Sequence, residues 1–366
     1  MRILFFLALI LTAMITKAQE KLLLVGTYTQ NISEGIYVYS FNEDNGEIKK
    51  ISVTKSENPS YLAVSENNKV YSVNENNGEG KVGAYSFDKK SGTLQFINSQ
   101  PSNGAGPCYI AIDKTNKWVV TANYTGGNFC VYPVNSDGSL GHVVQNIHHS
   151  GSSIDKSRQE KPHVHSVVFT PDQKYIAVVD LGIDKIIFYP FDASRPKPVV
   201  EKGIEVNSKP GAGPRHIVFH PTQPLAYVIE ELSGYVSVYR IKNGKFTYLQ
   251  TINAHPADFK GDIGSAAIKL SPDGKFLYAS NRGTSNTIAV FAIEQFMGQL
   301  KLIGIHKTGG DHPRDIAVDP SGKYLLSANS RSNTVSVFKL DPATGLPEDN
   351  GKLYEVPEPT CLVFPE

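Results

Sequence analysis

Short hydrophobic runs separated by polar turns recur along the chain, and one unit of this pattern is repeated. The unit consists of Pro, an apolar run, a polar turn such as Pro-Asp-Gly-Lys, a second apolar run and then Asn. Its clearest copies are residues 106–123, 213–230 and 312–329. Short runs rich in Val, Ile and Tyr are typical of strands buried on both faces, and Gly, Asp and Pro favour the turns between them. The pattern therefore predicts antiparallel pairs of buried strands.

The unit recurs roughly every 50 residues, a period typical of propellers and solenoids. Its copies begin near Pro59, Pro107, Pro162, Pro214, Ser265, Pro313 and Pro359. Most units contain four strand-like runs, which in the sixth unit are residues 314–318, 323–328, 334–340 and the weaker 351–356. We therefore expect each unit to form one four-stranded sheet, or blade.

The two ends of the chain complement each other. The seventh unit stops after one strand, residues 360–364, whereas the N-terminal part supplies the three missing strands at residues 21–28, 35–41 and 46–53. The C-terminal strand is expected to complete this first blade, which closes the ring and leaves no long exposed edge. The predicted fold is an all-β, seven-bladed β-propeller that forms a single domain over residues 19–366. Because such a ring closes on itself, we expect a monomer.

Residues 1–18 have the features of a secretory signal peptide. Arg2 precedes an apolar run from Ile3 to about Ile15, and Ala18 ends a plausible cleavage site. The run is too short for a comfortable membrane span, and a polar chain follows at once. We therefore expect a periplasmic or secreted protein that has no membrane attachment after cleavage.

Composition and charge narrow the possible functions. The formal net charge is +1 and no block of basic residues occurs, which argues against nucleic acid or a membrane surface as the partner. Cys108, Cys130 and Cys361 are too few for a disulfide framework, and we expect them to be small buried residues. The sequence has no metal-ligand spacing, nucleophile elbow, phosphate-binding loop or dinucleotide fingerprint, so we expect neither a metal nor a cofactor.

Departures from the repeat gather at one end of the predicted blades. The start of the innermost strand and the end of the antiparallel second strand lie on one face, near the central channel. The residue after each unit's Pro is Ser60, Cys108, His163, Arg215, Ala266, Arg314 or Thr360. Two positions further on, every unit has an apolar residue except the third, which has His165. The residue that follows the second strand is Thr27, Glu75, Tyr124, Leu181, Glu231, Arg282 or Ser330.

These positions predict a polar pocket shared by adjacent blades. Its members are His163, His165, Arg215, Glu231, Arg282 and Arg314. Guanidinium groups bind carboxylate or phosphate through two parallel hydrogen bonds, a His or Glu can activate water, and Arg can stabilise a developing oxyanion. The set therefore suits an anionic ligand with a carbonyl group. The alternative is a network of ion pairs that only lines a wet channel.

The sequence assigns no function to the other histidines. Strand alternation predicts that His216, directly after Arg215, points away from the pocket. His312 precedes the Pro of a unit and is expected to reach the rim. Context places five more in loops or turns: His148, His149, His220, His255 and His306.

Several stretches together resemble the bacterial 6-phosphogluconolactonase family of seven-bladed propellers, which also includes fungal carboxy-muconate lactonising enzymes. The stretches are residues 106–128, 158–172, 179–186, 211–221, 271–283 and 310–326. Three motifs within them are specific when found together: His-x-His at 163–165, Gly-Pro-Arg-His at 213–216 and Asn-Arg-Gly at 281–283. The resemblance covers about residues 21–365, nearly the whole mature chain.

The resemblance implies an enzyme that hydrolyses a sugar-acid lactone without a metal. It implies four catalytic residues in this sequence: His165, Arg215, Glu231 and Arg282. His163 is the rival for the catalytic His, and His163 and Arg314 are expected to bind substrate. Either Glu231 or His165 could be the general base.

The expected export bears on the substrate. 6-Phosphogluconolactone, the best-known substrate of the family, is a cytosolic intermediate, so an exported member is expected to act on an unphosphorylated lactone. The alternative function is a non-catalytic exported propeller that binds a sugar acid or a protein partner, since fold alone does not decide function.

Overall fold

A computed structural model describes residues 20–242, 245–348 and 351–365 of the chain. The predicted signal peptide, residues 1–18, lies outside these described residues. Within them, no helix is long and apolar enough to cross a membrane.

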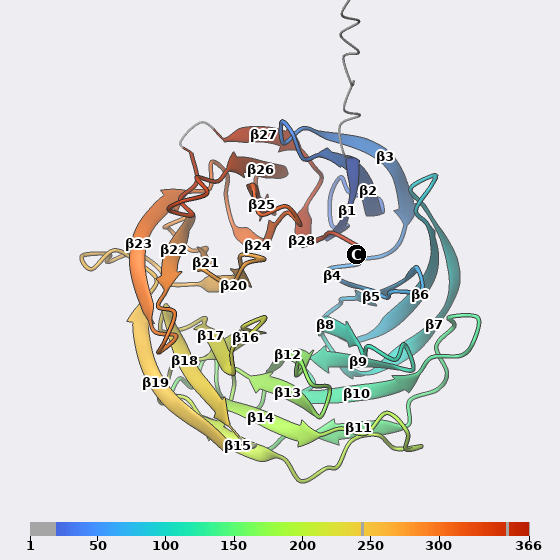
Figure 1. The fold of residues 1–366 in the computed structure, drawn as a ribbon. Coiled ribbons are helices and arrows are strands. Elements are labelled where there is room, and N and C mark those ends of the chain that lie inside the picture. The colour runs from blue at the N-terminus through green and yellow to red at the C-terminus, as the bar shows by residue number, and fades with distance from the viewer. Residues whose placement is uncertain (1–19, 243–244, 349–350, 366) are drawn as a thin grey trace, which may run out of the picture.

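In the part of the chain that the structure describes, seven four-stranded antiparallel sheets form a ring about a central axis (Figure 1). The innermost strands are β28 (Pro359–Val363), β4 (Tyr61–Val64), β8 (Pro107–Ile112), β12 (Val164–Phe169), β16 (Pro214–Phe219), β20 (Ser265–Leu270) and β24 (Pro313–Val318). The second strands are β1 (Glu20–Thr27), β5 (Lys69–Asn74), β9 (Trp118–Asn123), β13 (Tyr175–Asp180), β17 (Leu225–Glu230), β21 (Phe276–Asn281) and β25 (Tyr324–Asn329).

Two further strands complete each blade toward the perimeter. The third strands are β2 (Gly35–Asn42), β6 (Glu79–Asp88), β10 (Asn128–Pro133), β14 (Lys185–Pro190), β18 (Tyr235–Lys242), β22 (Thr287–Ile293) and β26 (Thr334–Lys339). The outermost strands are β3 (Ile48–Lys55), β7 (Thr93–Ala105), β11 (Gln145–His148), β15 (Ile204–Asn207), β19 (Lys245–Asn253), β23 (Leu300–Lys307) and β27 (Lys352–Glu355).

The ring closes through its two termini. The C-terminal strand β28 pairs antiparallel with β1, with Leu24 opposite Val363 and Val25 opposite Leu362. The blade therefore has the order β28-β1-β2-β3, which joins the last strand of the chain to the first three. The predicted seven-bladed propeller and its closure are confirmed.

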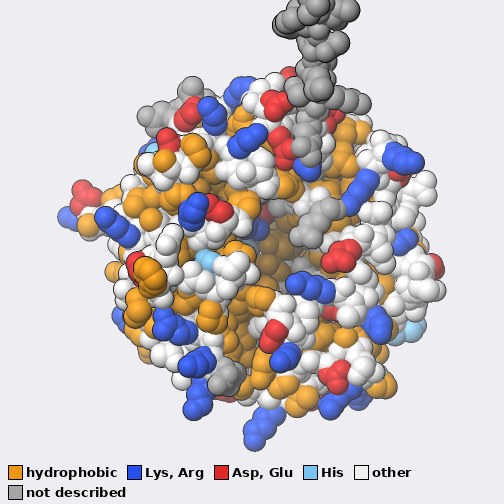
Figure 2. Space-filling model, viewed as in Figure 1, with side chains coloured by type: hydrophobic (Ala, Val, Ile, Leu, Met, Phe, Trp, Pro, Cys, Tyr) orange, Lys and Arg blue, Asp and Glu red, His pale blue; other side chains and the backbone are white. Residues whose placement is uncertain are grey.

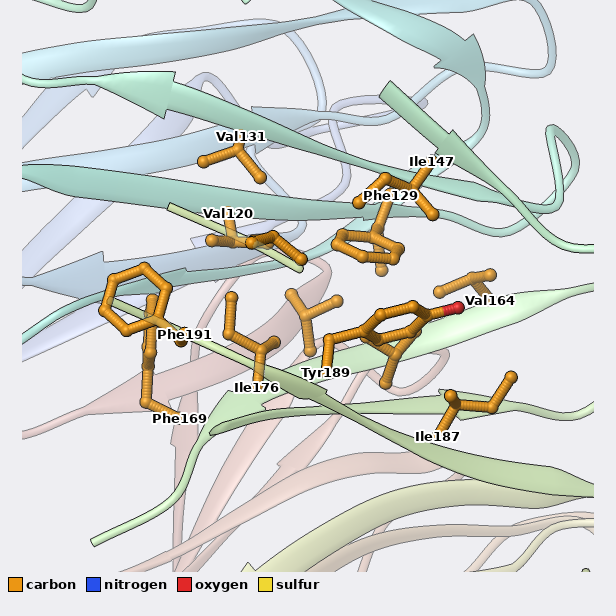
Figure 3. Packing of buried hydrophobic residues seen from close by; sticks show 14 of the residues in the cluster. Val120, Phe129, Val131, Ile147, Val164, Phe169, Ile176, Ile187, Tyr189 and Phe191 are labelled. Carbon is orange, nitrogen blue, oxygen red and sulfur yellow. The ribbon is translucent and has the colours of Figure 1, made fainter. Parts of the chain in front are cut away.

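Hydrophobic side chains fill the space between neighbouring blades, as Figure 3 shows for the β8–β11 and β12–β15 blades. Phe129 of β10 lies against Tyr189 of β14, with ring centroids 5.0 Å apart. Each large apolar side chain buried in this way contributes about 1.5–3 kcal/mol to folding. Because both faces of a blade are covered, its inner strands are apolar without alternation. Cys108, Cys130 and Cys361 are buried and unbonded, as expected.

The central channel widens into a hollow at one face of the disc, where hydrophobic side chains surround the depression (Figure 2). A cavity of about 810 Å³ lies among the inner strands, lined in part by Tyr109, Ile217, Lys269 and Leu362. Most of its lining comes from the later residues of the inner strands and the turns after them. The polar starts of these strands therefore lie toward the opposite face.

A β-bulge marks the start of most inner strands. Pro214 pairs with Glu230 and His216 pairs with Ile229, so Arg215 is the extra residue of its strand. Comparable register shifts occur at the starts of β8, β12, β20 and β24 and on the β1–β28 pair. Bulges bend a strand and redirect its side chains, and they are common next to functional sites.

Candidate active site

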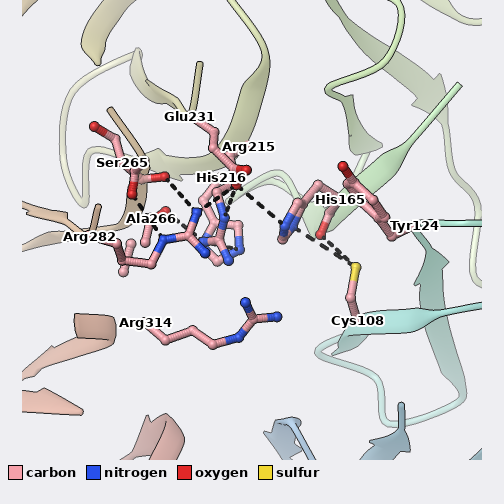
Figure 4. Close-up of polar contacts among 12 residues, drawn as sticks. Cys108, Tyr124, His165, Arg215, His216, Glu231, Ser265, Ala266, Arg282 and Arg314 are labelled. Carbon is pink, nitrogen blue, oxygen red and sulfur yellow. Dashed lines mark hydrogen bonds and ion pairs between the residues drawn. The ribbon is translucent and has the colours of Figure 1, made fainter. Parts of the chain in front are cut away.

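One buried carboxylate, that of Glu231, is the centre of the polar cluster (Figure 4). Its Oε2 lies 2.9 Å from Nε of Arg215 and 2.9 Å from Nη2 of Arg282. Its Oε1 lies 2.6 Å from Nη2 of Arg158. Arg215 is the bulge residue of β16, whereas Glu231 and Arg282 directly follow β17 and β21. The hairpins of two adjacent blades therefore bring these three groups together.

The guanidinium groups keep Glu231 ionised. Only 6% of Glu231 is exposed, and burial by itself would raise the pKa of its carboxyl group. Arg282, Arg215 and Arg158 outweigh that effect and hold the pKa well below its usual range. The cluster nevertheless contains more positive than negative charge around this carboxylate, so it can accept a further anion.

Arg215 is fixed between two blades. Its Nη1 donates a hydrogen bond to the Ala266 carbonyl at 2.7 Å and lies 3.1 Å from Nε2 of His216. Burial, together with Arg282, lowers the pKa of Arg215 to about 10. The side chain therefore remains a cation at neutral pH although it is only 2% exposed.

His165 is a neutral imidazole beside the carboxylate. Its Nε2 lies 4.0 Å from Oε2 of Glu231, and its Nδ1 lies 4.0 Å from Sγ of Cys108. The ring also meets the rings of Tyr124 and His216 edge-on, each with centroids 5.3 Å apart. Burial and then Arg215 hold the pKa of His165 well below its usual value, so the imidazole is uncharged at neutral pH.

Arg314 approaches the centre from the blade beyond Arg282. Its Nη2 lies 3.7 Å from Oε2 of Glu75, and its guanidinium carbon lies 5.1 Å from the centre of the Tyr28 ring. Burial would lower the pKa of Arg314, but Tyr28 and Glu75 outweigh it and raise the pKa. Figure 4 shows its guanidinium group pointing toward the side of the cluster that Arg215 and His165 occupy.

His163 lies one layer further out than His165. Its Nδ1 is 3.1 Å from the Tyr124 carbonyl, and its Nε2 is 3.2 Å from Oε2 of Glu160. Its ring stacks on that of Tyr124 with centroids 4.5 Å apart. Of the six predicted pocket residues, the structure brings four around the carboxylate or directly beside it: His165, Arg215, Glu231 and Arg282. Arg314 faces this group, and His163 supports Tyr124 behind it.

The bulges overturn part of the predicted register. β12 begins at Val164, which pairs with Asp180, so His165 is the bulge residue equivalent to Arg215. The prediction that His165 is the polar member of an apolar ring was therefore wrong, because Val167 occupies that position. In the first blade Thr27 pairs with Pro359, which makes Tyr28 the residue equivalent to Glu231.

The prediction that His216 points away was also wrong. A bulge places two consecutive residues opposite one partner residue, so strand alternation fails there. His216 lies beside Arg215 and against the rings of Tyr61 and Tyr109, with centroids 6.0 and 5.1 Å away. His312, which was expected to reach the rim, lines a cavity together with Tyr28, Arg314 and Arg331.

Two of the histidines that context placed in loops or turns lie in strands instead. His148 ends strand β11 and His306 lies within β23, so neither is a loop residue. His149 lies in a loop as predicted, and its buried side chain has Nδ1 2.7 Å from Oδ2 of Asp180.

Sequence reasoning missed Arg158 and Tyr28. Arg158 lies in the long segment before β12, and its Nη2 also donates to the Tyr124 hydroxyl at 3.2 Å. In the sequence, the only sign that pointed to Arg158 was that this segment is longer than the segments before the other inner strands. Tyr28 was missed because the N-terminal blade was placed one residue out of register. Among the described residues, no group of three or more His, Cys, Asp or Glu is arranged to hold a metal ion.

The arrangement combines features that ester hydrolysis requires. A neutral imidazole stands beside a buried carboxylate, and guanidinium groups face the same space. Such groups can take a proton from water and stabilise negative charge on a carbonyl oxygen.

Comparison with known proteins places the chain in a family. Residues 22–364 match the family described as "Lactonase, 7-bladed beta-propeller". The chain belongs to this lactonase family. The lactonase is 39% identical to the 6-phosphogluconolactonase of Bacillus subtilis over 93% of this chain and 97% of the relative. It is 38% identical to the 6-phosphogluconolactonase of Formosa agariphila over 91% and 95% of the two chains.

A solved structure agrees with this placement. The periplasmic gluconolactonase of Pseudomonas aeruginosa is 36% identical to this lactonase and superposes with a TM-score of 0.90. The match covers 95% of this chain and 99% of the neighbour. The family resemblance found in the sequence is therefore confirmed.

Proposed function

We propose that this lactonase hydrolyses the ring ester of a sugar-acid lactone at the cluster around Glu231. The observation that supports the proposal most is the meeting of three guanidinium groups on one buried carboxylate beside the neutral imidazole of His165. The relatives named 6-phosphogluconolactonase and gluconolactonase support the substrate class.

In the proposed reaction, water attacks the carbonyl carbon of the lactone while Nε2 of His165 accepts one of its protons. The negative charge that develops on the carbonyl oxygen is stabilised by Arg215 and Arg282. The bond between the carbonyl carbon and the ring oxygen then breaks, and the proton on His165 passes to the departing oxygen. The product is the open-chain hydroxy acid.

Of the two candidate bases, His165 fits better than Glu231. The oxygens of Glu231 accept hydrogen bonds from Arg215 and Arg158, and Oε2 also forms an ion pair with Arg282, so three guanidinium groups already engage this carboxylate. Its charge would instead stabilise the imidazolium form of His165 when the proton arrives. We therefore assign Glu231 to positioning Arg215 and Arg282 and to charge stabilisation.

The same proposal covers the setting of the reaction. We expect a periplasmic or secreted monomer that needs no metal or cofactor and acts on a small-molecule lactone. Export would favour an unphosphorylated sugar-acid lactone over 6-phosphogluconolactone.

A panel of lactones tests the proposal. Purified mature protein is assayed with gluconolactone, 6-phosphogluconolactone and other sugar-acid lactones against their spontaneous hydrolysis, with and without a chelator. Acceleration of at least one lactone that persists with chelator is expected. If none is accelerated, but a sugar acid raises the melting temperature, the protein is a binding propeller instead. Loss of activity with chelator would contradict the metal-free reaction.

A further inference from the structure

A polar cavity of about 360 Å³ adjoins the cluster through Arg314. It lies where the last blade meets the closing blade, between the β1–β2 loop, the β25–β26 loop and the starts of β24 and β28 (Figure 1). The residues that matter for its chemistry are Tyr28, Asn31, His312, Arg314, Arg331 and Glu358. Because Arg314 faces both spaces, a ligand in the active site could extend one end into this cavity.

Two of these residues occupy a backbone conformation that favours glycine. The residue before the unit's Pro has a φ of 64° at Gly106 and 62° at Gly213, but also 61° at His312 and 42° at Glu358. The carbonyl of this residue accepts a hydrogen bond from the residue after the second strand, such as Ser330 for His312. A residue that carries a side chain is strained in this backbone conformation, whereas glycine is not. Residues with such strain are common at functional sites.

The charges of the cavity favour an anion. The carboxylate of Glu358 is already bound by the backbone N–H groups of Asn31, Ile32 and Ser33 at 3.0, 3.2 and 3.3 Å. Arg331 is exposed, and its side chain forms no ion pair with any described residue. Arg314 is 3.7 Å from its nearest carboxylate partner.

His312 adds an uncharged hydrogen-bonding group. Burial, with the nearby Arg282, Arg331 and Arg314, lowers the pKa of His312 to about 3, so its imidazole is neutral at physiological pH. Its Nδ1 is buried and has no hydrogen-bond partner among the described residues. A buried polar atom without a partner calls for an explanation, such as a ligand or ordered water.

We propose that this cavity is an anion subsite, in which Arg331, Arg314 and His312 bind a carboxylate or phosphate at the end of the substrate remote from the lactone ring. The inference rests on the proposed lactone hydrolysis and narrows it to lactones that carry a second anionic group. Arg331 and His312 would then determine specificity without taking part in the bond-breaking step.

Substrate selectivity tests the subsite. The value of kcat/KM is measured for neutral gluconolactone, for 6-phosphogluconolactone and for a glucaric acid lactone, whose far end is a carboxylate. In Arg331→Gln, the ratio of kcat/KM for the preferred anionic lactone to that for gluconolactone should fall about tenfold or more through KM, the scale of a lost hydrogen bond to a charged group. His312→Asn should lower the same ratio, because the variant lacks the imidazole. Asn is chosen because it tolerates the left-handed backbone conformation at this position.

The matched control is Arg195→Gln, an exposed arginine that pairs with Asp192 after β14. It should leave the ratio within about twofold. The two anionic substrates show whether the subsite selects phosphate or carboxylate. A ratio that is unchanged in Arg331→Gln and His312→Asn would overturn the subsite while leaving lactone hydrolysis intact.

Binding measurements separate this inference from the proposed function. If no lactone is hydrolysed, 6-phosphogluconate and glucarate are titrated into the wild type and Arg331→Gln by calorimetry. Binding to the wild type that weakens in Arg331→Gln would support the subsite, and absence of binding, or equal binding to both proteins, would overturn it.

Discussion

Nε of Arg215 lies 2.9 Å from Oε2 of Glu231, and both side chains are almost completely buried. The backbone fixes the pair. Pro214 of β16 pairs with Glu230 of β17, Arg215 is the bulge residue after Pro214, and Glu231 is the residue after Glu230. Arg215 depends on Glu231 for its counter-charge, since a buried cation without one would be uncompensated.

Glu231→Gln should therefore destabilise the protein. Arg215 and Arg282 would lose their shared counter-charge, and removal of one partner of a buried pair costs about 3–5 kcal/mol. Urea unfolding measures the free energy of unfolding. The control is Glu205→Gln, which breaks the exposed 2.6 Å pair with Lys185 and should cost less than about 1 kcal/mol. Equal losses in the two variants would contradict the role of Glu231 as the counter-ion of the cluster.

Arg215→Lys should lower kcat by roughly 100-fold, the scale of losing one group that stabilises transition-state charge. From sequence alone, we expect folding to be little changed. The structure alters that expectation, because Nη1 also donates to the Ala266 carbonyl of the next blade and Lys cannot make both contacts. A fall in stability of about 1–3 kcal/mol is therefore predicted as well.

Turnover and melting temperature are both measured for this variant, with the exposed Arg195→Lys as control. A kcat near that of the wild type would remove Arg215 from the active site. A large loss of stability with a proportionate loss of activity would assign the residue a purely structural role.

Lowering the pH should destabilise the folded protein already at pH values well above those at which carboxyl groups titrate. Burial first, and Arg215 next, keep the pKa of both His165 and His216 well below 6.5 in the folded protein. Below that pH the unfolded chain binds protons that the folded state does not, so stability is present above about pH 6.5 and is lost as pH falls.

The melting temperature should fall by about 3 °C or more between about pH 7.5 and pH 5.5. In His216→Asn the fall should be smaller, whatever the absolute stability of the variant. An identical pH dependence in both proteins would show that His216 does not stay neutral in the folded state.

The repeat was sufficient to predict the fold but not the register of the site. Pro, the polar turns and Asn mark the blades, so the ring and its closure through residues 360–364 followed from the sequence. A bulge leaves no mark in the apolar pattern, because the extra residue is itself a site residue such as Arg215 or His165. The ring position of His165 and the direction of His216 were therefore wrong.

Residues outside the repeat could not be found by comparing units. Arg158 reaches Glu231 from an irregular segment, and its position depends on how that segment folds over Tyr124. The charge states also required the structure, because the low pKa of Glu231 results from groups that come from separate blades.

The central claim is that His165 and the arginines around Glu231 open a lactone ring. The most direct measurement is kcat/KM of wild type and His165→Gln on the best lactone of the panel, corrected for spontaneous hydrolysis and accompanied by melting temperatures. Gln can form a hydrogen bond near the position of Nε2 but cannot accept a proton from water. We predict that kcat/KM falls by about 100-fold or more, the contribution of a general base, while the protein stays folded. Wild-type activity in a folded His165→Gln protein would contradict the account.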